Sequence, residues 1–156
     1  MIKKNGFSDV NTKAELGRTA YHLACKNGHS NIVKMIIKKF PKFNIMLNAK
    51  DDCGWTAFHL ACKYGHSEVV EMIIQKSPKF NIELNAKDSI GWTAFHLACN
   101  KGKERTALIM IEHSKLFRLD LTVKDNDGNT GFQLAQKNNR KNITDLIKSK
   151  MPSIAF

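Results

Sequence analysis

The chain has 156 residues, of which 42 % are hydrophobic and 25 % are charged, and its formal net charge is +11. This length suits one compact domain or a short array of small units. No apolar run approaches the roughly 18 residues that would predict a membrane span, and the N-terminal MIKKNGFSDV lacks the apolar stretch of a secretory signal. We therefore expect no membrane insertion and a reducing compartment, the cytoplasm or the nucleus, with free cysteine thiols.

A period of 37 residues runs through the chain. The string GWTAFHLAC occurs at 54–62 and again, letter for letter, at 91–99, with GRTAYHLAC at 17–25 and GNTGFQLAQ at 128–136 in the same register. Four units therefore begin at Gly17, Gly54, Gly91 and Gly128. Self-similarity at this period predicts a solenoid, in which each unit buries its apolar face against its neighbours.

The second unit shows the expected order of elements. Thr56 is a suitable N-cap for a first helix, AFHLACKY, which Gly65 would end in the left-handed conformation. Ser67 is suited to cap a second helix, EVVEMIIQK, whose apolar stripe should stop before Pro78. The unit therefore begins as helix, tight turn, helix.

The rest of the second unit is expected to be extended and then to turn. Phe80, Ile82 and Leu84 alternate with polar residues, which is the period of a segment with one buried side. The closing NAKDSIG is rich in turn formers. A turn that projects outward should therefore lead into the next unit.

The four units share a motif, which reads TAYHLACKNGHS at 19–30, TAFHLACKYGHS at 56–67, TAFHLACNKGK at 93–103 and TGFQLAQKNN at 130–139. This pattern resembles the ankyrin repeat over nearly the whole chain. The resemblance implies an all-α fold, an ankyrin-repeat solenoid of stacked helix-turn-helix units with β-hairpin-like turns. Complete repeats are expected at 17–53, 54–90 and 91–127.

The two ends of the chain are expected to differ. Unit four, 128–156, ends in NITDLIKSK, whose outer face is polar as a C-terminal capping repeat requires. Residues 1–16 do not show the pattern of a capping repeat. Their MIKK followed by GFSDVN is instead similar to the end of a second helix and its loop. We expect part of a preceding repeat there, with the turn that leads into the array, and hence descent from a longer array.

The sequence departs from the family pattern in two respects. Alanine stands at 20, 57 and 94, where the family usually has proline after the threonine. The period is also longer than the usual repeat of about 33 residues. The extra length falls at the PKFN segments around Pro41 and Pro78, and Phe43, Phe80 and Phe117 recur there in register. We expect these segments to form packed loops.

Three histidine and cysteine pairs could be read as metal half-sites, namely His22 with Cys25, His59 with Cys62 and His96 with Cys99. A closed zinc site needs four ligands on one ion, whereas neighbouring parallel helices lie about 10 Å apart. That separation also exceeds the roughly 7 Å limit for a disulfide. In the family the matching histidine is a structural hydrogen-bonding residue. We therefore expect no metal and a structural role for each pair.

Catalysis is not expected either. Asp51, Asp88 and Asp125 recur once per turn, where the family uses aspartate to organise the hairpin. No base or nucleophile is constrained beside them, and no glycine-rich phosphate loop is present. The sequence predicts a protein that is not an enzyme and needs no cofactor.

The resemblance implies a binding surface made of the hairpin turns and the exposed side of each first helix, on a concave face. The turn lysine row comprises Lys13, Lys50, Lys87 and Lys124, and the helix lysine row comprises Lys26, Lys63, Lys101 and Lys137. The aromatic patch between them comprises Trp55, Tyr64, Ile90 and Trp92. The candidate partner-binding residues are Arg18, Lys26, Lys50, Cys53, Trp55, Lys63, Tyr64, Lys87, Ile90, Trp92, Lys101, Lys124 and Asn129.

These residues favour a non-catalytic, monomeric protein-interaction module with an acidic protein partner, because tryptophan and tyrosine are enriched in binding hot spots and lysines attract acidic groups. One alternative is a structural segment of a larger scaffold protein. Another is nucleic-acid binding, which is less favoured because lysines about 10 Å apart match poorly a duplex with a charge every 1.7 Å or so. In the plainest alternative, lysine solubilises the turns and tryptophan shields the start of each helix.

Overall fold

The computed structural model describes residues 9–155. Within that range the protein consists of eight α-helices and two 3₁₀ turns, with no strand. The α-helices are α1 (Ala20–Lys26), α2 (Ser30–Phe43), α3 (Ala57–Tyr64), α4 (Ser67–Phe80), α5 (Ala94–Lys101), α6 (Glu104–His113), α7 (Gly131–Lys137) and α8 (Lys141–Lys150). The 3₁₀ turns are η1 (Glu15–Gly17) and η2 (Pro152–Ile154).

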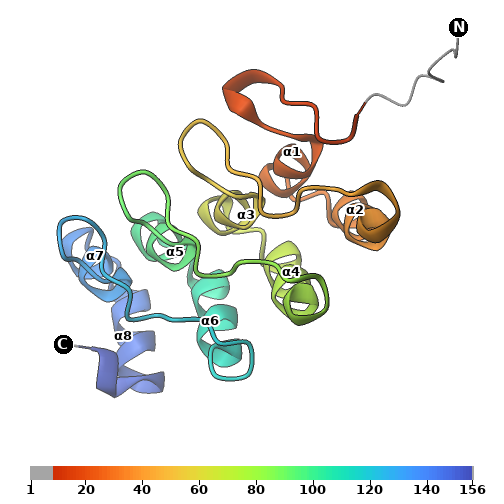
Figure 1. Cartoon of the computed structure of the whole chain (residues 1–156). Coiled ribbons are helices and arrows are strands. Elements are labelled where there is room, and N and C mark those ends of the chain that lie inside the picture. The colour runs from red at the N-terminus through yellow and green to blue at the C-terminus, as the bar shows by residue number, and fades with distance from the viewer. Residues whose placement is uncertain (1–8, 156) are drawn as a thin grey trace, which may run out of the picture.

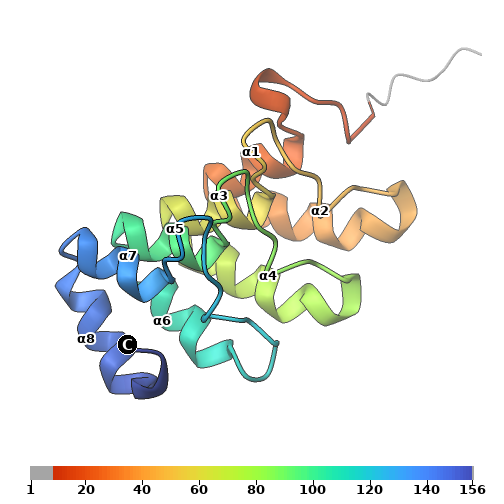
Figure 2. The same ribbon diagram turned by 60° about the vertical axis from the view of Figure 1, so that its left-hand side comes forward.

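The helices form two layers, one of odd-numbered and one of even-numbered helices (Figure 1). Successive helices of a layer pack on each other, α1 on α3 and α3 on α5 in the first layer, α2 on α4 and α4 on α6 in the second. The turns between repeats project beyond the odd-numbered layer (Figures 1 and 2). The expected all-α solenoid with hairpin-like turns is therefore confirmed.

Each first helix begins at the expected threonine. In α3 the Thr56 hydroxyl accepts the backbone N–H of His59, and the His59 ring accepts the backbone N–H of Thr56, so the two residues form a capping box. Gly65 ends the helix with φ of 71°, a left-handed conformation that a Cβ atom disfavours. Both predictions from the second unit are confirmed.

The second helices begin one residue earlier than their sequence pattern indicates. Ser67, the expected N-cap, is the first residue of α4, and the N-cap position is His66. Neither side chain caps the helix. The Nε2–H of His66 instead donates to the carbonyl of Lys26 in the preceding repeat at 2.7 Å, and the Ser67 hydroxyl lies 3.2 Å from that of Thr106 in the next repeat. Contacts between repeats therefore occupy the groups that a local cap would use.

The expectation that the second helix stops before Pro78 is wrong, because α4 runs through Pro78 to Phe80. Proline has no N–H to donate to the carbonyl of Ile74, four residues earlier. The Ser77 hydroxyl donates to that carbonyl instead, at 2.7 Å. A serine side chain thus replaces the missing backbone donor in α4, whereas α2 continues through Pro41 with Phe40 at the equivalent position.

In the first two repeats the extra residues therefore lengthen the second helix and do not form the packed loop that we expected. In the third repeat α6 ends at His113, and Phe117 lies in a turn and packs against the core, as expected. Phe43 and Phe80 are helical, and left-handed Asn44 and Asn81 (φ 50° and 51°) follow them. Only the last part of the expected extended segment remains. There Ile82 and Leu84 are buried on either side of exposed Glu83, which fits a period of two.

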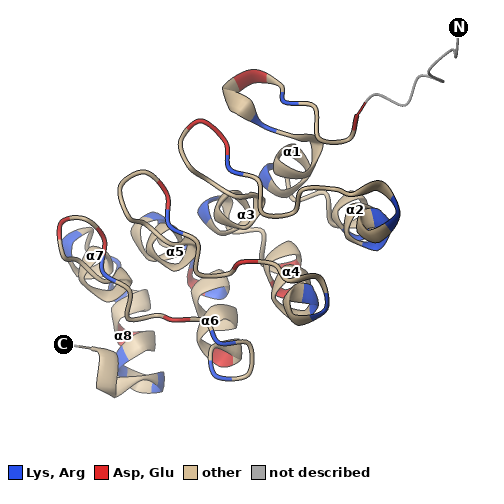
Figure 3. Cartoon of the chain, in the orientation of Figure 1, with Lys and Arg blue, Asp and Glu red and all other residues tan. Residues whose placement is uncertain are grey.

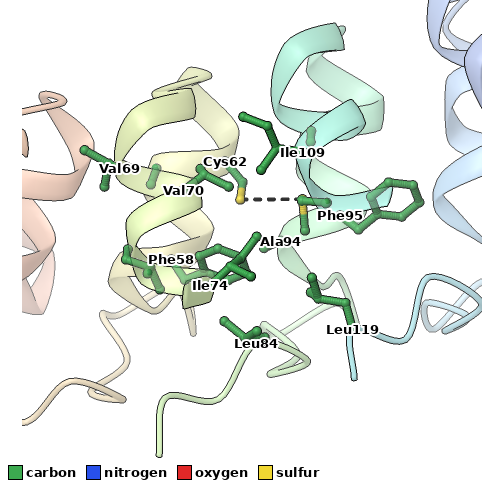
Figure 4. Packing of buried hydrophobic residues seen from close by; sticks show 14 of the residues in the cluster. Phe58, Cys62, Val69, Val70, Ile74, Leu84, Ala94, Phe95, Ile109 and Leu119 are labelled. Atoms are coloured by element: carbon green, nitrogen blue, oxygen red, sulfur yellow. Dashed lines mark hydrogen bonds between the residues drawn. The ribbon is translucent and has the colours of Figure 1, made fainter. Parts of the chain in front are cut away.

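The core runs the length of the array between the two layers. Phe58 and Phe95 of the first layer are almost fully buried, in register with Phe132. Figure 4 shows the packing around Cys62, whose Sγ–H donates to Met110 Sδ at 3.8 Å. The core joins all four repeats, so each repeat depends on its neighbours for its burial.

The outer side of the last helix is polar, and its assignment to a capping repeat stays a prediction. In α8, Ile143 and Ile147 are buried, while Lys141, Asp145 and Lys148 are exposed. The segment MIKKNGFS, in which we expect the end of a preceding repeat, lies outside the described residues.

Candidate partner-binding site

Three of the four turns are each organised by one aspartate, whereas the first turn has Ala14 at the equivalent position. Oδ1 of Asp88 accepts the backbone N–H groups of Ile90 and Trp92 at 3.0 and 2.8 Å, and the backbone N–H of Asp88 donates to the carbonyl of Trp92 at 2.9 Å. Asp51 and Asp125 make the same bonds in their own turns. These three carboxylates are therefore structural, as the sequence predicts.

The second oxygen of each aspartate accepts a side chain from the preceding repeat. Nε1–H of Trp55 donates to Oδ2 of Asp88 at 2.8 Å, and Trp92 bonds Asp125 in the same way at 2.9 Å. Hydrogen bonds to the ionised form lower the pKa of Asp125 although its burial alone would raise it. Each tryptophan is thus held half-buried in a fixed position on the turn.

The three histidines of the first helices, His22, His59 and His96, are held as neutral rings. Nδ1 of His59 accepts the backbone N–H of Thr56 at 3.1 Å, so Nε2 carries the proton and donates it to the carbonyl of Trp92 at 3.0 Å. His22 and His96 make equivalent bonds. Desolvation by burial lowers the pKa of all three rings. Their predicted structural role is confirmed.

The cysteines paired with these histidines are buried free thiols. Burial raises the pKa of Cys25, Cys62 and Cys99 well above the ordinary value, which keeps the thiols protonated and unreactive. Among residues 9–155 no group of three or more histidine, cysteine, aspartate or glutamate side chains is placed to hold a metal ion. Cys53 differs, because it lies half-buried in a turn.

One lysine joins the two aromatic rings at the centre of the surface. Nζ of Lys63 lies 4.1 Å from the ring centroid of Trp55 and 5.4 Å from that of Tyr64. Nζ of Lys26 lies 6.0 Å from the Tyr64 centroid. An ammonium group at these distances is attracted to the face of an aromatic ring. Trp55, Tyr64, Lys26 and Lys63 therefore form one cluster across α1, α3 and the turn before α3.

The turn lysine row follows the backbone from one repeat to the next. Nζ of Lys50 donates to the carbonyl of Lys87 at 2.7 Å, and Nζ of Lys87 donates to the carbonyl of Lys124 at 3.3 Å. All three side chains are exposed. Figure 3 shows lysine and acidic residues side by side in these turns. The carboxylates of Asp51 and Asp125 are buried in hydrogen bonds, whereas Asp52 and Asp127 are exposed, so the turns present both lysine and aspartate charges to solvent.

A family model described as ankyrin repeats, in three copies, matches residues 1–88, which is more than half of the chain. The chain belongs to the ankyrin repeat family. A comparison with curated proteins finds no matching relative. The ankyrin helix pairs continue beyond the matched residues as α5 with α6 and α7 with α8.

Ankyrin repeats are generally protein–protein interaction modules, and the family is typically non-catalytic. No helix between residues 9 and 155 is long and apolar enough to span a membrane. A protein is therefore the kind of partner that members of this family generally bind. The repeat boundaries given above stay a prediction.

The ankyrin array brings most of the candidate residues to its turns and first helices, but Arg18 has a different position. Arg18 is only 7 % exposed, and its Nε–H donates to Oδ2 of Asp51 at 3.1 Å. It thus makes the bond that Trp55 and Trp92 make in later repeats. Because its charge is paired inside the chain, we remove Arg18 from the candidate surface.

The remaining candidates keep some exposure. Tyr64, Ile90 and the side chains of the turn lysine row are the most accessible. Half-buried positions are occupied by Lys26, Cys53, Trp55, Lys63, Trp92 and Asn129. Lys101 is exposed at the end of α5. Lys137, on α7, donates to Oδ1 of Asn129 at 2.7 Å, which adds the fourth ankyrin repeat to the surface.

Sequence reasoning missed an asparagine that recurs once per repeat and bonds the equivalent loop of the next repeat. The Asn48 amide donates to the carbonyl of Asn81 at 2.9 Å, and its oxygen accepts the backbone N–H of Glu83 at 2.9 Å. Asn11 and Asn85 make the same pair of bonds. The recurrence of asparagine at this period was the available signal.

Proposed function

We propose that this ankyrin array is a non-catalytic interaction module that binds an acidic segment of a protein partner on its turns and first helices. The proposal rests on one observation, the cluster in which Lys63 lies over Trp55 and Tyr64 beside the exposed lysines of the turns. Aromatic side chains supply contact area at low entropic cost, and lysines steer an acidic partner.

The fixed position of the tryptophans supports the proposal. Trp55 and Trp92 are bonded to aspartates of the following turn, so binding would not have to order these rings. Side chains that are already ordered in the free protein lose less entropy on association. We propose Trp55, Tyr64 and Trp92 as the contact residues and Lys50, Lys87 and Lys124 as the steering residues.

A non-catalytic role is supported by the histidine and cysteine side chains of the first helices, which are hydrogen-bonded or buried within the chain. The rings of His22, His59 and His96 use both nitrogens for hydrogen bonds within the chain. The neighbouring thiols are buried and protonated. We further propose that the protein acts as a monomer in the cytoplasm or nucleus, where its free cysteines would remain reduced.

The two tryptophans give a direct test, because each contributes one indole N–H signal to a ¹⁵N correlation spectrum. The labelled full-length protein is titrated with a glutamate-rich peptide and, separately, with a lysine-rich peptide of the same length. We expect the glutamate-rich peptide alone to shift both indole signals and the amides of the turns. Shifts confined to other surfaces, or equal shifts with both peptides, would reject the proposal.

A matched pair of variants tests the role of the charge. Lys50→Gln with Lys87→Gln removes two ammonium groups of the turn lysine row, whereas Lys76→Gln with Lys79→Gln removes two exposed ones from α4. Both variants lose the same net charge. We expect affinity for the glutamate-rich peptide to fall by about tenfold in the first variant and to change little in the second.

A further inference from the structure

The outer side of α2, at the N-terminal end of the described array, is apolar. Ile32, Met35 and Phe43 are 44, 55 and 43 % exposed. Met35 and Phe43 line a cavity of about 330 Å³, together with Asp9, Val10, Ile36, Lys39 and Ile45. Three large apolar side chains exposed on one helix point to a binding site, because exposed apolar residues are normally scattered singly.

The repeat symmetry indicates the shape of the occupant. Ile32 corresponds to Val69 of α4, one period later, and Val69 is only 1 % exposed. Leu23 of α1, 38 % exposed, corresponds to Leu60 of α3, which is fully buried. In later repeats these positions are covered by the preceding helix pair, as α2 packs on α4. The outer side of α2 thus repeats a surface that accepts a helix.

The charge of α2 indicates the chemistry of the occupant. The helix contains Lys34, Lys38, Lys39 and Lys42 and no acidic residue (Figure 3). A second copy bound through the same face would bring these lysines together, which is unfavourable. The opposite end of the array offers no apolar partner either, because the outward residues of α8 are polar. An acidic border on the occupant would complement the four lysines.

We propose that the outer side of α2 binds an amphipathic helix of a partner protein, with apolar residues that enter the cavity and an acidic border that faces the α2 lysines. A helix that binds in an apolar groove uses anchors spaced by three or four residues along one face. This surface is separate from the aromatic patch on the turns. The two surfaces can therefore be tested independently.

The probe is a fluorescent peptide of about 18 residues, designed with leucines at helical spacing and glutamate on the remaining positions. A second peptide has the same composition with the leucines dispersed, and a third has lysine in place of glutamate. Binding to the full-length protein is measured by fluorescence anisotropy, and helix formation by circular dichroism. We expect the first peptide alone to bind and to gain helicity.

Variants locate the site. Ile32→Gln with Met35→Gln alters two exposed residues of α2, and Leu116→Gln alters a residue that is 77 % exposed near the end of α6. Lys39→Gln with Lys42→Gln is matched by Lys76→Gln with Lys79→Gln, one period later on α4. We expect each α2 variant to weaken binding at least about tenfold and each control to leave it unchanged. Thermal melts verify that all variants fold.

Four results would overturn the proposal. The first is equal binding of the dispersed or lysine-bearing peptide, and the second is unchanged affinity in the α2 variants. The third is a dimer in light scattering that Ile32→Gln with Met35→Gln abolishes, because a second copy would then cover the face. The fourth is binding to phosphatidylserine vesicles, lost in the same variant, without binding of the first peptide, because the face would then contact a membrane surface.

Discussion

The indole N–H of Trp55 donates to Oδ2 of Asp88, 2.8 Å away in the next turn. The same carboxylate organises its own turn through Oδ1. One aspartate therefore couples the shape of one turn to the position of a side chain in the turn before it. The coupling makes the tryptophan structural as well as a candidate contact residue.

Two substitutions of Trp55 distinguish the contribution of its hydrogen bond to stability from the contribution of its aromatic ring. Trp55→Phe keeps an aromatic ring but loses the donor to Asp88, so we expect the free energy of unfolding to fall by about 1–3 kcal/mol. Trp55→Arg should be tolerated better, because Arg18 makes the equivalent bond to Asp51. Urea unfolding of both variants measures the difference. Equal losses for phenylalanine and arginine would show that the bond contributes nothing.

The buried histidines predict a dependence of stability on pH. Desolvation lowers the pKa of His59 below 6.5 in the folded chain, whereas the unfolded chain binds a proton near pH 6.5. The stabilisation is therefore complete above this pH and is lost as the pH falls through the folded pKa. We expect wild type to lose stability between about pH 7 and pH 5.

His59→Gln tests this assignment, because Gln133 already replaces the histidine in the fourth repeat and bonds the backbone N–H of Thr130 at 2.9 Å. The variant should lose the bond to Trp92, at a cost of about 1 kcal/mol near pH 7. It should also reduce the pH slope by at most about 1.4 kcal/mol per pH unit. Denaturant titrations at several pH values give both quantities, and an unchanged slope would contradict the prediction.

Ser77 and Pro78 form a pair whose coupling can be measured. Ser77→Ala leaves the carbonyl of Ile74 without its donor, and we expect a loss of about 1–3 kcal/mol. With Pro78→Ala the backbone N–H returns, so Ser77→Ala should then cost less. A double-mutant cycle from urea unfolding measures the coupling energy. Additive effects would mean that the serine does not compensate for the proline.

Gly54 and Gly128 occupy equivalent positions and have φ of 79° and 81°. Alanine at either position adopts a strained left-handed conformation, at a cost of about 1–2 kcal/mol. At Gly54 the new Cβ would also lie 2.9 Å from the backbone nitrogen of Ser89, whereas at Gly128 no atom lies within 4 Å. Gly54→Ala should therefore lower the melting temperature more than Gly128→Ala. Equal melting temperatures would show that the next turn moves aside freely.

The sequence predicted the parts of the fold that depend on near neighbours. Thr56 and Gly65 cap one short helix, and their spacing along the chain is enough to assign these roles, whereas the hydrogen-bonding role of His59 was implied by the family resemblance. The period predicted the stacking, because it repeats the whole helix pair. These local and periodic features account for most of the architecture.

Prediction failed where a distant residue changes the local rule. The start of α4 was misplaced because His66 bonds a carbonyl in the preceding repeat. Arg18 looked like a free cation in the sequence, and only the folded chain shows Asp51 against it. The second helices of the first two repeats also continue through Pro41 and Pro78, and only at Pro78 does a serine supply a side-chain donor, so the residue types beside the prolines did not predict this.

The asparagine links have a mechanical consequence. Asn11, Asn48 and Asn85 each form these hydrogen bonds only with the equivalent loop of the next repeat, so none of the links spans two repeats. Tension applied to the ends of the chain would load these links in series. The array would then lengthen in steps, each of which releases one period of 37 residues, or roughly 120–130 Å of extended chain.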